Sequence, residues 1–220
     1  MKKHLLPLLL LTGLLITSLT SFAHCDTKDG PVVADANKAI EQNNVNYVLK
    51  WVQPANEKEI KEAFELTMKV RELSPDAKTL TDNYFFETLV RIHRSGEGVP
   101  YTGVKPPGTP IDEKILAADK SIEAGDLSPL NNLVPKDKLT ELKKRFDKVM
   151  SLKDFDVNDV QAGREYVEAY VQFFHFAEGE GEHNHNHSGV SGHFGHIPWI
   201  VSGILLIISV SFGILYFRKK

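Results

Sequence analysis

The sequence predicts an all-α protein, a helical bundle built from two tandem repeats and followed by a C-terminal transmembrane helix. Three observations carry this prediction. Apolar residues recur at helical spacing, and strand-like alternation is absent. The chain also matches itself, without a gap, when it is shifted by 82 residues. Near its end, an uncharged apolar stretch of about 21 residues is long enough to cross a bilayer.

The first segment, residues 1–23, is predicted to be a signal peptide. Two lysines and an apolar run lead to the small-x-small sequence Ser21-Phe22-Ala23, which is typical of a signal-peptidase site. We therefore expect cleavage after Ala23, export of the chain, and a mature N-terminus at His24.

The two repeats are predicted to span residues 24–95 and 111–177, joined by a Gly/Pro-rich linker at 96–110. The 82-residue shift aligns two short motifs, Ala36-x-Lys38-x-Ile40-Glu41 and Ala118-x-Lys120-x-Ile122-Glu123. The same shift pairs Phe64 with Phe146, Met68 with Met150, Tyr84 with Tyr166 and His93 with His175. Helical spacing indicates helices over residues 56–73, 76–95 and 135–152, and another that begins at Asp156.

The C-terminal part is predicted to be a flexible His-rich stalk at 178–196, a transmembrane helix at 197–217 and a cytoplasmic tail at 218–220. Basic residues after the span place the tail inside the cell. We expect a single-pass cell-membrane protein with an extracytoplasmic ectodomain. The formal net charge is −3 and no basic stripe is visible, which argues against a nucleic-acid partner.

Cleavage after Ala23 would bring four metal ligands together within two residues, His24 and Cys25. The new α-amine can lose its proton near neutral pH. A metal bound to it can close chelate rings with the amide nitrogen and Sγ of Cys25, and the His24 imidazole can approach from a third direction. Thiolate and nitrogen ligands suit copper, nickel or zinc. His24 and Cys25 are therefore the candidate catalytic and metal-binding residues.

Cys25 is the only cysteine, and two other interpretations of it stay open. It could carry a lipid, although the preceding His24 fits a lipidation signal poorly and the predicted transmembrane helix makes a lipid redundant. It could also be a spare thiol, or pair between chains.

The mature start, HCDTKDGPVV, resembles the metal hook of nickel superoxide dismutase, which reads HCxxPCG. The matching positions are His24, Cys25, Asp26 and Gly30. Lys28 stands in place of the hook proline and Asp29 in place of the second cysteine. The same start resembles a family of exported helical bacterial proteins of uncharacterised function. The first resemblance implies a redox metal, and the loss of one thiolate shifts the preference slightly from nickel to copper. We call residues 24–30 the hook.

Further ligands are expected from three places. Asp29 could be an oxygen ligand, a hydrogen-bond acceptor behind the ligands, or a turn residue. His93 and His175 lie on the apolar face of the last helix of each repeat, so they could complete the metal site, or be core histidines bonded to backbone carbonyls. Weaker candidates, for loose metal capture by the stalk, are His183, His185, His187, His193 and His196.

No nucleotide-binding loop, Ser or Cys triad or HExxH motif is visible in the sequence. We favour a membrane-anchored, superoxide dismutase-like enzyme, in which copper or nickel at the hook alternates oxidation state and superoxide is the substrate. The first alternative is a protein that binds, stores or delivers copper or nickel. The second is a non-catalytic anchored helical module that binds another envelope protein.

Overall fold

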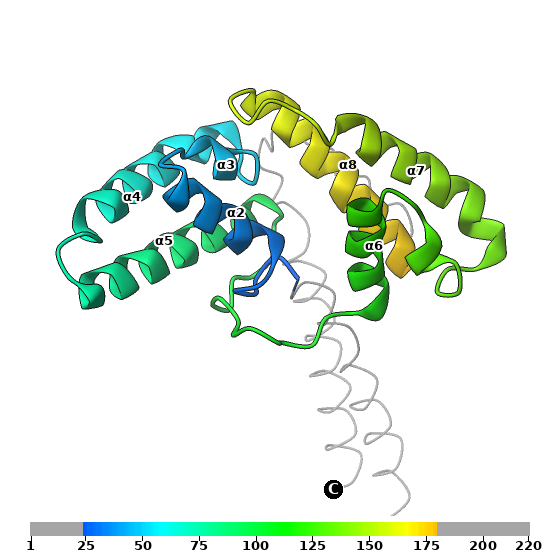
Figure 1. Ribbon diagram of the computed structural model, residues 1–220, viewed down its shortest axis with the longest axis horizontal. Helices are drawn as coiled ribbons and strands as arrows, with labels where there is room; N and C mark the ends of the chain where they lie inside the picture. The colour runs from blue at the N-terminus through cyan, green and yellow to red at the C-terminus, as the bar shows by residue number, and fades with distance from the viewer. Residues whose placement is uncertain (1–23, 180–220) are drawn as a thin grey trace, which may run out of the picture. The chain divides into compact units, whose positions relative to one another are not determined.

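The computed structural model describes residues 24–179, which form an all-helical unit (Figure 1). In this range there are seven α-helices and several short 3-10 turns, and the strand-like pairing there is an isolated bridge between Thr27 and Lys105. The all-α prediction is confirmed. The chain divides into two compact units, Met1–Glu182 and His183–Lys220, and all of the described residues belong to the first.

The predicted signal peptide, the predicted transmembrane helix and the stalk histidines lie outside the described residues. Among the helices of residues 24–179, none is long and apolar enough to span a bilayer.

The first half of the unit consists of α2 (Pro31–Glu41), α3 (Asn46–Leu49), α4 (Glu57–Val70) and α5 (Pro75–Gly96). Helices α4 and α5 pack side by side as a hairpin, and α2 packs on α3 and α5. Prolines at the first positions of α2 and α5 fit there because the first turn of a helix leaves its N–H groups unbonded. The Ser74 side chain caps α5 by accepting a hydrogen bond from the Ala77 N–H.

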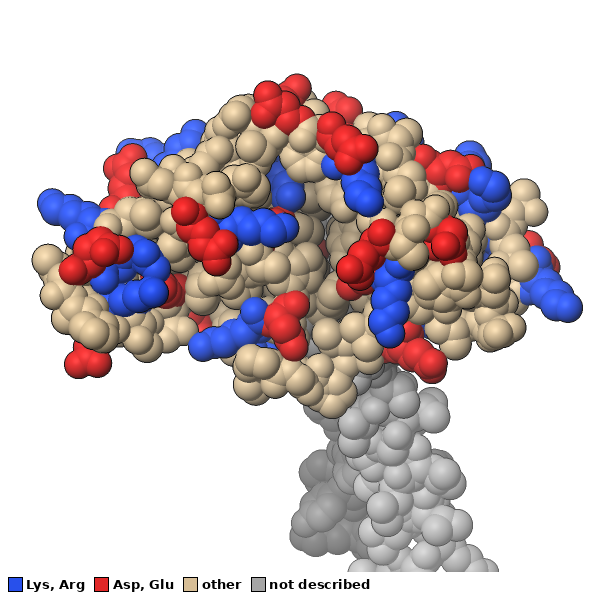
Figure 2. Space-filling view, viewed as in Figure 1, with Lys and Arg blue, Asp and Glu red and all other residues tan. Residues whose placement is uncertain are grey.

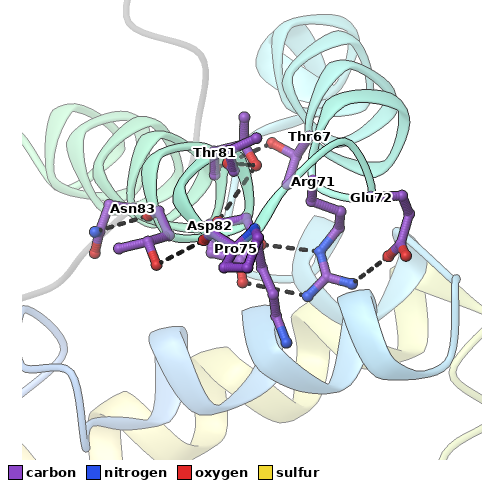
Figure 3. Close-up of polar contacts among 10 residues, drawn as sticks. Thr67, Arg71, Glu72, Pro75, Thr81, Asp82 and Asn83 are labelled. Carbon is purple, nitrogen blue, oxygen red and sulfur yellow. Dashed lines mark hydrogen bonds and ion pairs between the residues drawn. The ribbon is translucent and has the colours of Figure 1, made fainter.

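Polar contacts hold the closed end of this hairpin, as Figure 3 shows. The Arg71 guanidinium donates to both carboxylate oxygens of Asp82, at 3.0 and 3.2 Å. The Thr67 hydroxyl donates to the backbone carbonyl of Thr81 at 3.2 Å. Because a bidentate Arg–carboxylate pair has a fixed geometry, it sets the register of α4 against α5.

The second half consists of α6 (Glu113–Ala124), α7 (Leu139–Leu152) and α8 (Val160–Glu178). Here α7 and α8 form the hairpin, and α6 packs on α8. Helices α4 and α7 begin and end 82 residues apart. The 3-10 turns that precede them, Pro54–Asn56 and Lys136–Lys138, are separated by the same 82 residues.

The ring contacts within the two hairpins nevertheless differ. Phe64 packs on Phe85 with ring centroids 5.5 Å apart, whereas Phe146 packs on Phe173 at 5.7 Å. The residue 82 positions after Phe85 is Val167 rather than Phe173. The internal duplication therefore stays a prediction from the sequence.

The start of α8 also differs from the helix predicted to begin at Asp156. The Asp159 side chain accepts a hydrogen bond from the Ala162 N–H at 3.0 Å and caps the helix, so α8 begins at Val160. Asp156 instead begins a turn. The carbonyl oxygen of Asp156 accepts a hydrogen bond from the Asp159 N–H at 2.9 Å.

A buried lysine joins the two halves. Lys50 forms an ion pair with Asp35 at 2.9 Å, and each side chain is only 10% exposed. The same ammonium lies 5.1 Å from the ring centre of Phe155 and 5.9 Å from that of Tyr166, both from the second half. Gly163 permits this approach, because a Cβ there would lie 3.0 Å from the Lys50 Cβ.

Charged side chains of both signs are interspersed on the face shown in Figure 2. Several neighbours on one helix form ion pairs, including Lys61 with Glu57 at 2.8 Å and Lys143 with Asp147 at 2.7 Å. This face therefore presents no large field of one sign that would attract a polyanion.

Candidate functional site

The hook folds back on itself before α2 begins. The Gly30 N–H donates to the Thr27 carbonyl at 3.0 Å, and the Thr27 hydroxyl donates to the His24 carbonyl at 3.2 Å. A Cβ on residue 30 would collide with the His24 carbonyl oxygen, so this turn requires glycine.

The loop between α5 and α6 holds the hook from one side, and Figure 1 shows the two segments together, blue beside green. The Lys105 N–H donates to the Asp26 carbonyl at 2.7 Å, and the Lys28 N–H donates to the Lys105 carbonyl at 3.0 Å. The Asp29 carboxylate accepts from the Gly108 N–H at 3.0 Å. The predicted linker is therefore the loop against which the hook is held.

His24 is only 5% exposed, and its Nε2 faces the second half of the unit. Nε2 lies 2.9 Å from Asp119 Oδ2 on α6 and 2.9 Å from Tyr170 Oη on α8. The Tyr170 hydroxyl donates its own proton to Asp119 Oδ1 at 2.7 Å. Both neighbours of Nε2 can therefore only accept, so Nε2 carries the proton of the neutral imidazole.

This assignment leaves the other ring nitrogen of His24 with a free lone pair. Nδ1 is buried and finds no hydrogen-bond partner among the described residues. A metal-binding histidine has the same arrangement, since it usually donates its second N–H to a carboxylate. Burial and the Asp119 charge also raise the pKa of Tyr170 well above its ordinary value, which keeps the hydroxyl protonated.

Cys25 is a free thiol, 5% exposed. Burial raises the pKa of Cys25 well above its ordinary value of 9.0, and the carboxylates of Glu97, Asp26 and Asp119 act in the same direction. The Arg94 guanidinium opposes them. Without a bound cation the thiol is therefore protonated, and its surroundings are acidic.

Asp26 and Arg94 connect the hook to the end of α5. Arg94 Nε lies 3.4 Å from Asp26 Oδ1, and both side chains are 5% exposed. Burial raises the pKa of Asp26, while Arg94 and then His93 lower it. Arg94 Nη1 also pairs with Glu97 Oε2 at 2.8 Å. One guanidinium thus pairs with two carboxylates, Asp26 from the hook and Glu97 from the end of α5.

His93 is buried on α5, as its apolar neighbours in the sequence indicate. Its Nδ1 lies 2.9 Å from the Trp51 carbonyl oxygen, and its Nε2 lies 3.4 Å from Glu97 Oε1. His93 is therefore bonded to a backbone carbonyl and also has its second nitrogen directed at a carboxylate.

Asp29 and His175 have other partners. Asp29 is exposed, and the hydrogen bond from the Gly108 N–H lowers its pKa. His175 pairs with Glu178 through Nδ1 at 3.2 Å, and the ring that His24 contacts on α8 is that of the preceding residue, Phe174. Within residues 24–179, no three His, Cys, Asp or Glu side chains form a group that could hold a metal by themselves. A site here would need main-chain ligands as well.

Three residues of the site gave no signal in the sequence. Asp119 lies in a helix among alternating charged and small residues, where a carboxylate is usually solvated. Tyr170 lies on an apolar helical face, so the sequence predicts an ordinary core residue there. Glu97 belongs to a Gly-rich segment at the end of a helix. Tertiary packing alone brings them to the hook.

Comparison with known proteins gives a family but no assigned activity. A profile described as a family of unknown function (DUF6448) matches residues 29–176, so His24 and Cys25 precede the matched region. No curated protein and no solved structure matches the chain. The similarity of the hook to nickel superoxide dismutase therefore rests on the sequence resemblance alone. The profile covers more than half of the 220 residues, and the chain belongs to the DUF6448 family.

Proposed function

We propose that this chain is an exported, membrane-anchored metalloprotein whose processed N-terminus binds copper or nickel and catalyses superoxide dismutation. His24 and Cys25 carry the metal in this proposal. The signal peptide, the C-terminal membrane span and the extracytoplasmic location come from the sequence pattern and belong to the same proposal.

One observation carries the proposal: the buried lone pair of His24 Nδ1. A buried nitrogen without a partner is costly, and a metal ion would satisfy it. Asp119 and Tyr170 hold Nε2 and fix the tautomer that leaves Nδ1 free. Signal-peptide cleavage would add the α-amine, and Cys25 would supply its amide nitrogen and thiolate.

The acidic surroundings of Cys25 also support a cation. Asp26, Glu97 and Asp119 act on the thiol with negative charge, and Arg94 acts with positive charge. A divalent copper or nickel ion would offset the excess negative charge and take the thiolate as a ligand.

The burial of both residues favours a small substrate. His24 and Cys25 are each 5% exposed, so a protein that exchanges metal by offering its own ligands has little access to them. Superoxide is small enough to approach such a site. As the metal cycles, one superoxide is oxidised to O₂, and a second takes up one electron and two protons to give H₂O₂.

Capture and delivery of copper or nickel is the second candidate function. The sequence observation that favours it is the histidine-rich stretch from His183 to His196, which lies outside the described residues. Spaced imidazoles in a polar segment can hold such metals loosely. Stoichiometric transfer to an acceptor without superoxide turnover would favour this function over the enzyme.

The internal duplication is also part of the proposal. It is supported by the 82-residue sequence shift and by the matching bounds of α4 and α7. The ring partners of Phe64 and Phe146 differ, so these two contacts add no support to the duplication.

The position of the N-terminus provides the test. We would compare three full-length chains: one that starts at His24, one with a single Ala added before it, and one with Cys25→Ser. Only the first should bind one copper or nickel tightly with a thiolate-to-metal absorption band, and only it should remove superoxide. Equal metal content and activity in the Ala-extended chain would contradict a site built on the processed terminus.

A further inference from the structure

Four large apolar side chains are exposed on the hairpin of α4 and α5. Leu66 is 49% exposed and Leu73 is 76% exposed, and beyond the turn Leu80 is 72% and Tyr84 is 45% exposed. Within residues 24–179, the only other large apolar side chain this exposed is Leu116 on α6, at 41%. Single exposed leucines are common, but a cluster of four on one hairpin indicates a contact surface. We call these four residues of the hairpin the apolar flank.

An ion pair shows that the apolar flank lies on one side of the hairpin. Arg91 Nη2 on α5 binds Glu59 Oε1 on α4 at 2.7 Å, so both residues lie on the same side of the helix pair. Leu66 follows Glu59 by seven residues, or about two turns, and Tyr84 precedes Arg91 by the same seven residues. Both therefore lie on the side of the ion pair. The two other leucines continue these stripes toward the turn that joins the helices.

The exposed surface of the apolar flank is large enough for the centre of a dimer interface. Its four side chains expose on the order of 450 Å². The largest such patch on a typical monomer, about 300–600 Å², is often functional. An interface of standard size buries about 800 Å² per partner, and about 65% of a homodimer interface is apolar, which is about 520 Å². The apolar flank therefore supplies most of the apolar surface that such a dimer needs.

A lipid surface fits the apolar flank less well. Leu73 and Leu80 are its most exposed members, and they lie on either side of the turn between the helices. Glu72, next to Leu73, is 77% exposed and pairs with Arg71 at 3.2 Å (Figure 3). Asp76, on the other side of the turn, is also exposed. Insertion of the leucines into lipid would take both carboxylates out of water, which is costly, whereas packing side by side with a protein would leave them at the edge of the contact.

We propose that the apolar flank is the interface between two copies of this chain, in which two α4–α5 hairpins pack as a four-helix bundle. A two-fold axis brings the same patch of each copy together, which is the commonest arrangement of homo-oligomers. Apolar residues seven positions apart fit helix pairs that pack in this way. Glu59 and Arg91 already neutralise each other beside the patch, so the interface buries no unpaired charge there. This interface requires neither a bound metal nor the proposed catalytic activity.

The test uses the full-length chain purified in a mild detergent, and sedimentation measures its mass over a range of concentrations. A double variant, Leu73→Gln with Leu80→Gln, is compared with Leu116→Gln, which also replaces an exposed leucine. Circular dichroism shows whether each variant is folded. The chain should form dimers, and the double variant should raise the dissociation constant by at least about 10-fold. Leu116→Gln should leave the dissociation constant unchanged.

A second measurement locates the interface without weakening it. In a Cys25→Ser background, a short bis-maleimide should link two copies that carry Leu80→Cys, and it should not link copies that carry Leu116→Cys. Dimers that are equally tight in the double variant, or that are linked only through Leu116→Cys, would overturn the inference. A monomer at every concentration would also overturn it. Quenching of a dye at Leu80→Cys by phosphatidylcholine vesicles with a lipid-borne quencher would then assign the apolar flank to a lipid surface.

Discussion

Asp119→Asn should weaken metal binding at the hook by about 10- to 100-fold without unfolding the domain. Asp119 accepts one hydrogen bond from Tyr170 at 2.7 Å and one from His24 Nε2 at 2.9 Å. An asparagine offers one oxygen and one NH₂ group, so it cannot accept both. If the NH₂ group faces His24, the imidazole proton moves to Nδ1 and blocks the proposed ligand. A 10- to 100-fold loss corresponds to about 1.4–2.7 kcal/mol.

The control for this variant lies on the same helix. Glu123→Gln removes the same charge from α6, but Glu123 is exposed and one turn away from Asp119. Tyr170→Phe should have a smaller effect than Asp119→Asn, because His24 keeps its carboxylate acceptor. Ni²⁺ affinity of the three variants, measured by competition with a chelator, gives the order. An Asp119→Asn affinity equal to that of Glu123→Gln would refute the tautomer argument.

Three further predictions concern the fold around the hook. Gly30→Ala should destabilise the domain by about 1–3 kcal/mol, because its Cβ collides with the hook backbone. The control is Gly96→Ala, whose Cβ would meet Gln53 at 3.7 Å and should leave the stability unchanged. Thermal melts of both variants test this. The raised pKa of Cys25 means that the unfolded thiol ionises first, so stability of the metal-free chain is retained below pH 9.0 and should fall above it, by up to about 1.4 kcal/mol per pH unit. Urea titrations at pH 8 to 10 should show this fall, and Cys25→Ser should lack it. Asp35→Ala leaves the Lys50 charge buried without its carboxylate and should cost about 3–5 kcal/mol in urea unfolding, and a loss below about 1 kcal/mol would show that the surrounding aromatic rings suffice.

The helical class and the longer helices could be predicted because their apolar residues recur at a clear period. The helix predicted at 76–95 is α5, Pro75–Gly96, and that predicted at 56–73 is α4, Glu57–Val70. Helices α2 and α6 contain several alanines and fewer large apolar residues, so periodicity does not single them out. The shifted start of α8 depends on which of two aspartates caps it, a choice that local sequence leaves open.

The site was predictable only where it is local in sequence. His24 and Cys25 are adjacent in the sequence, so their pairing could be predicted. The need for glycine at Gly30 could not, because it depends on the turn that the structure shows. Asp119 and Tyr170 reach His24 from residues 95 and 146 positions away, and no spacing rule connects them. His93 was singled out by its apolar face, and the carboxylate that faces it, Glu97, is a local neighbour four residues further along the chain.

The way in which the hook is held bears on when a metal could bind. His24 is fixed by α6 and α8 of the second half, and Asp26 is fixed by Arg94 of the first half and by the loop before α6. The proposed ligands therefore reach their positions only when both halves have folded around the hook. In the proposed function the α-amine forms only when the predicted signal peptide is removed. A site that needs both the folded halves and the free α-amine would form after export. The unprocessed chain would then not bind a copper or nickel ion in this geometry. In the proposed function, redox chemistry at the thiolate would therefore be confined to the outer face of the membrane.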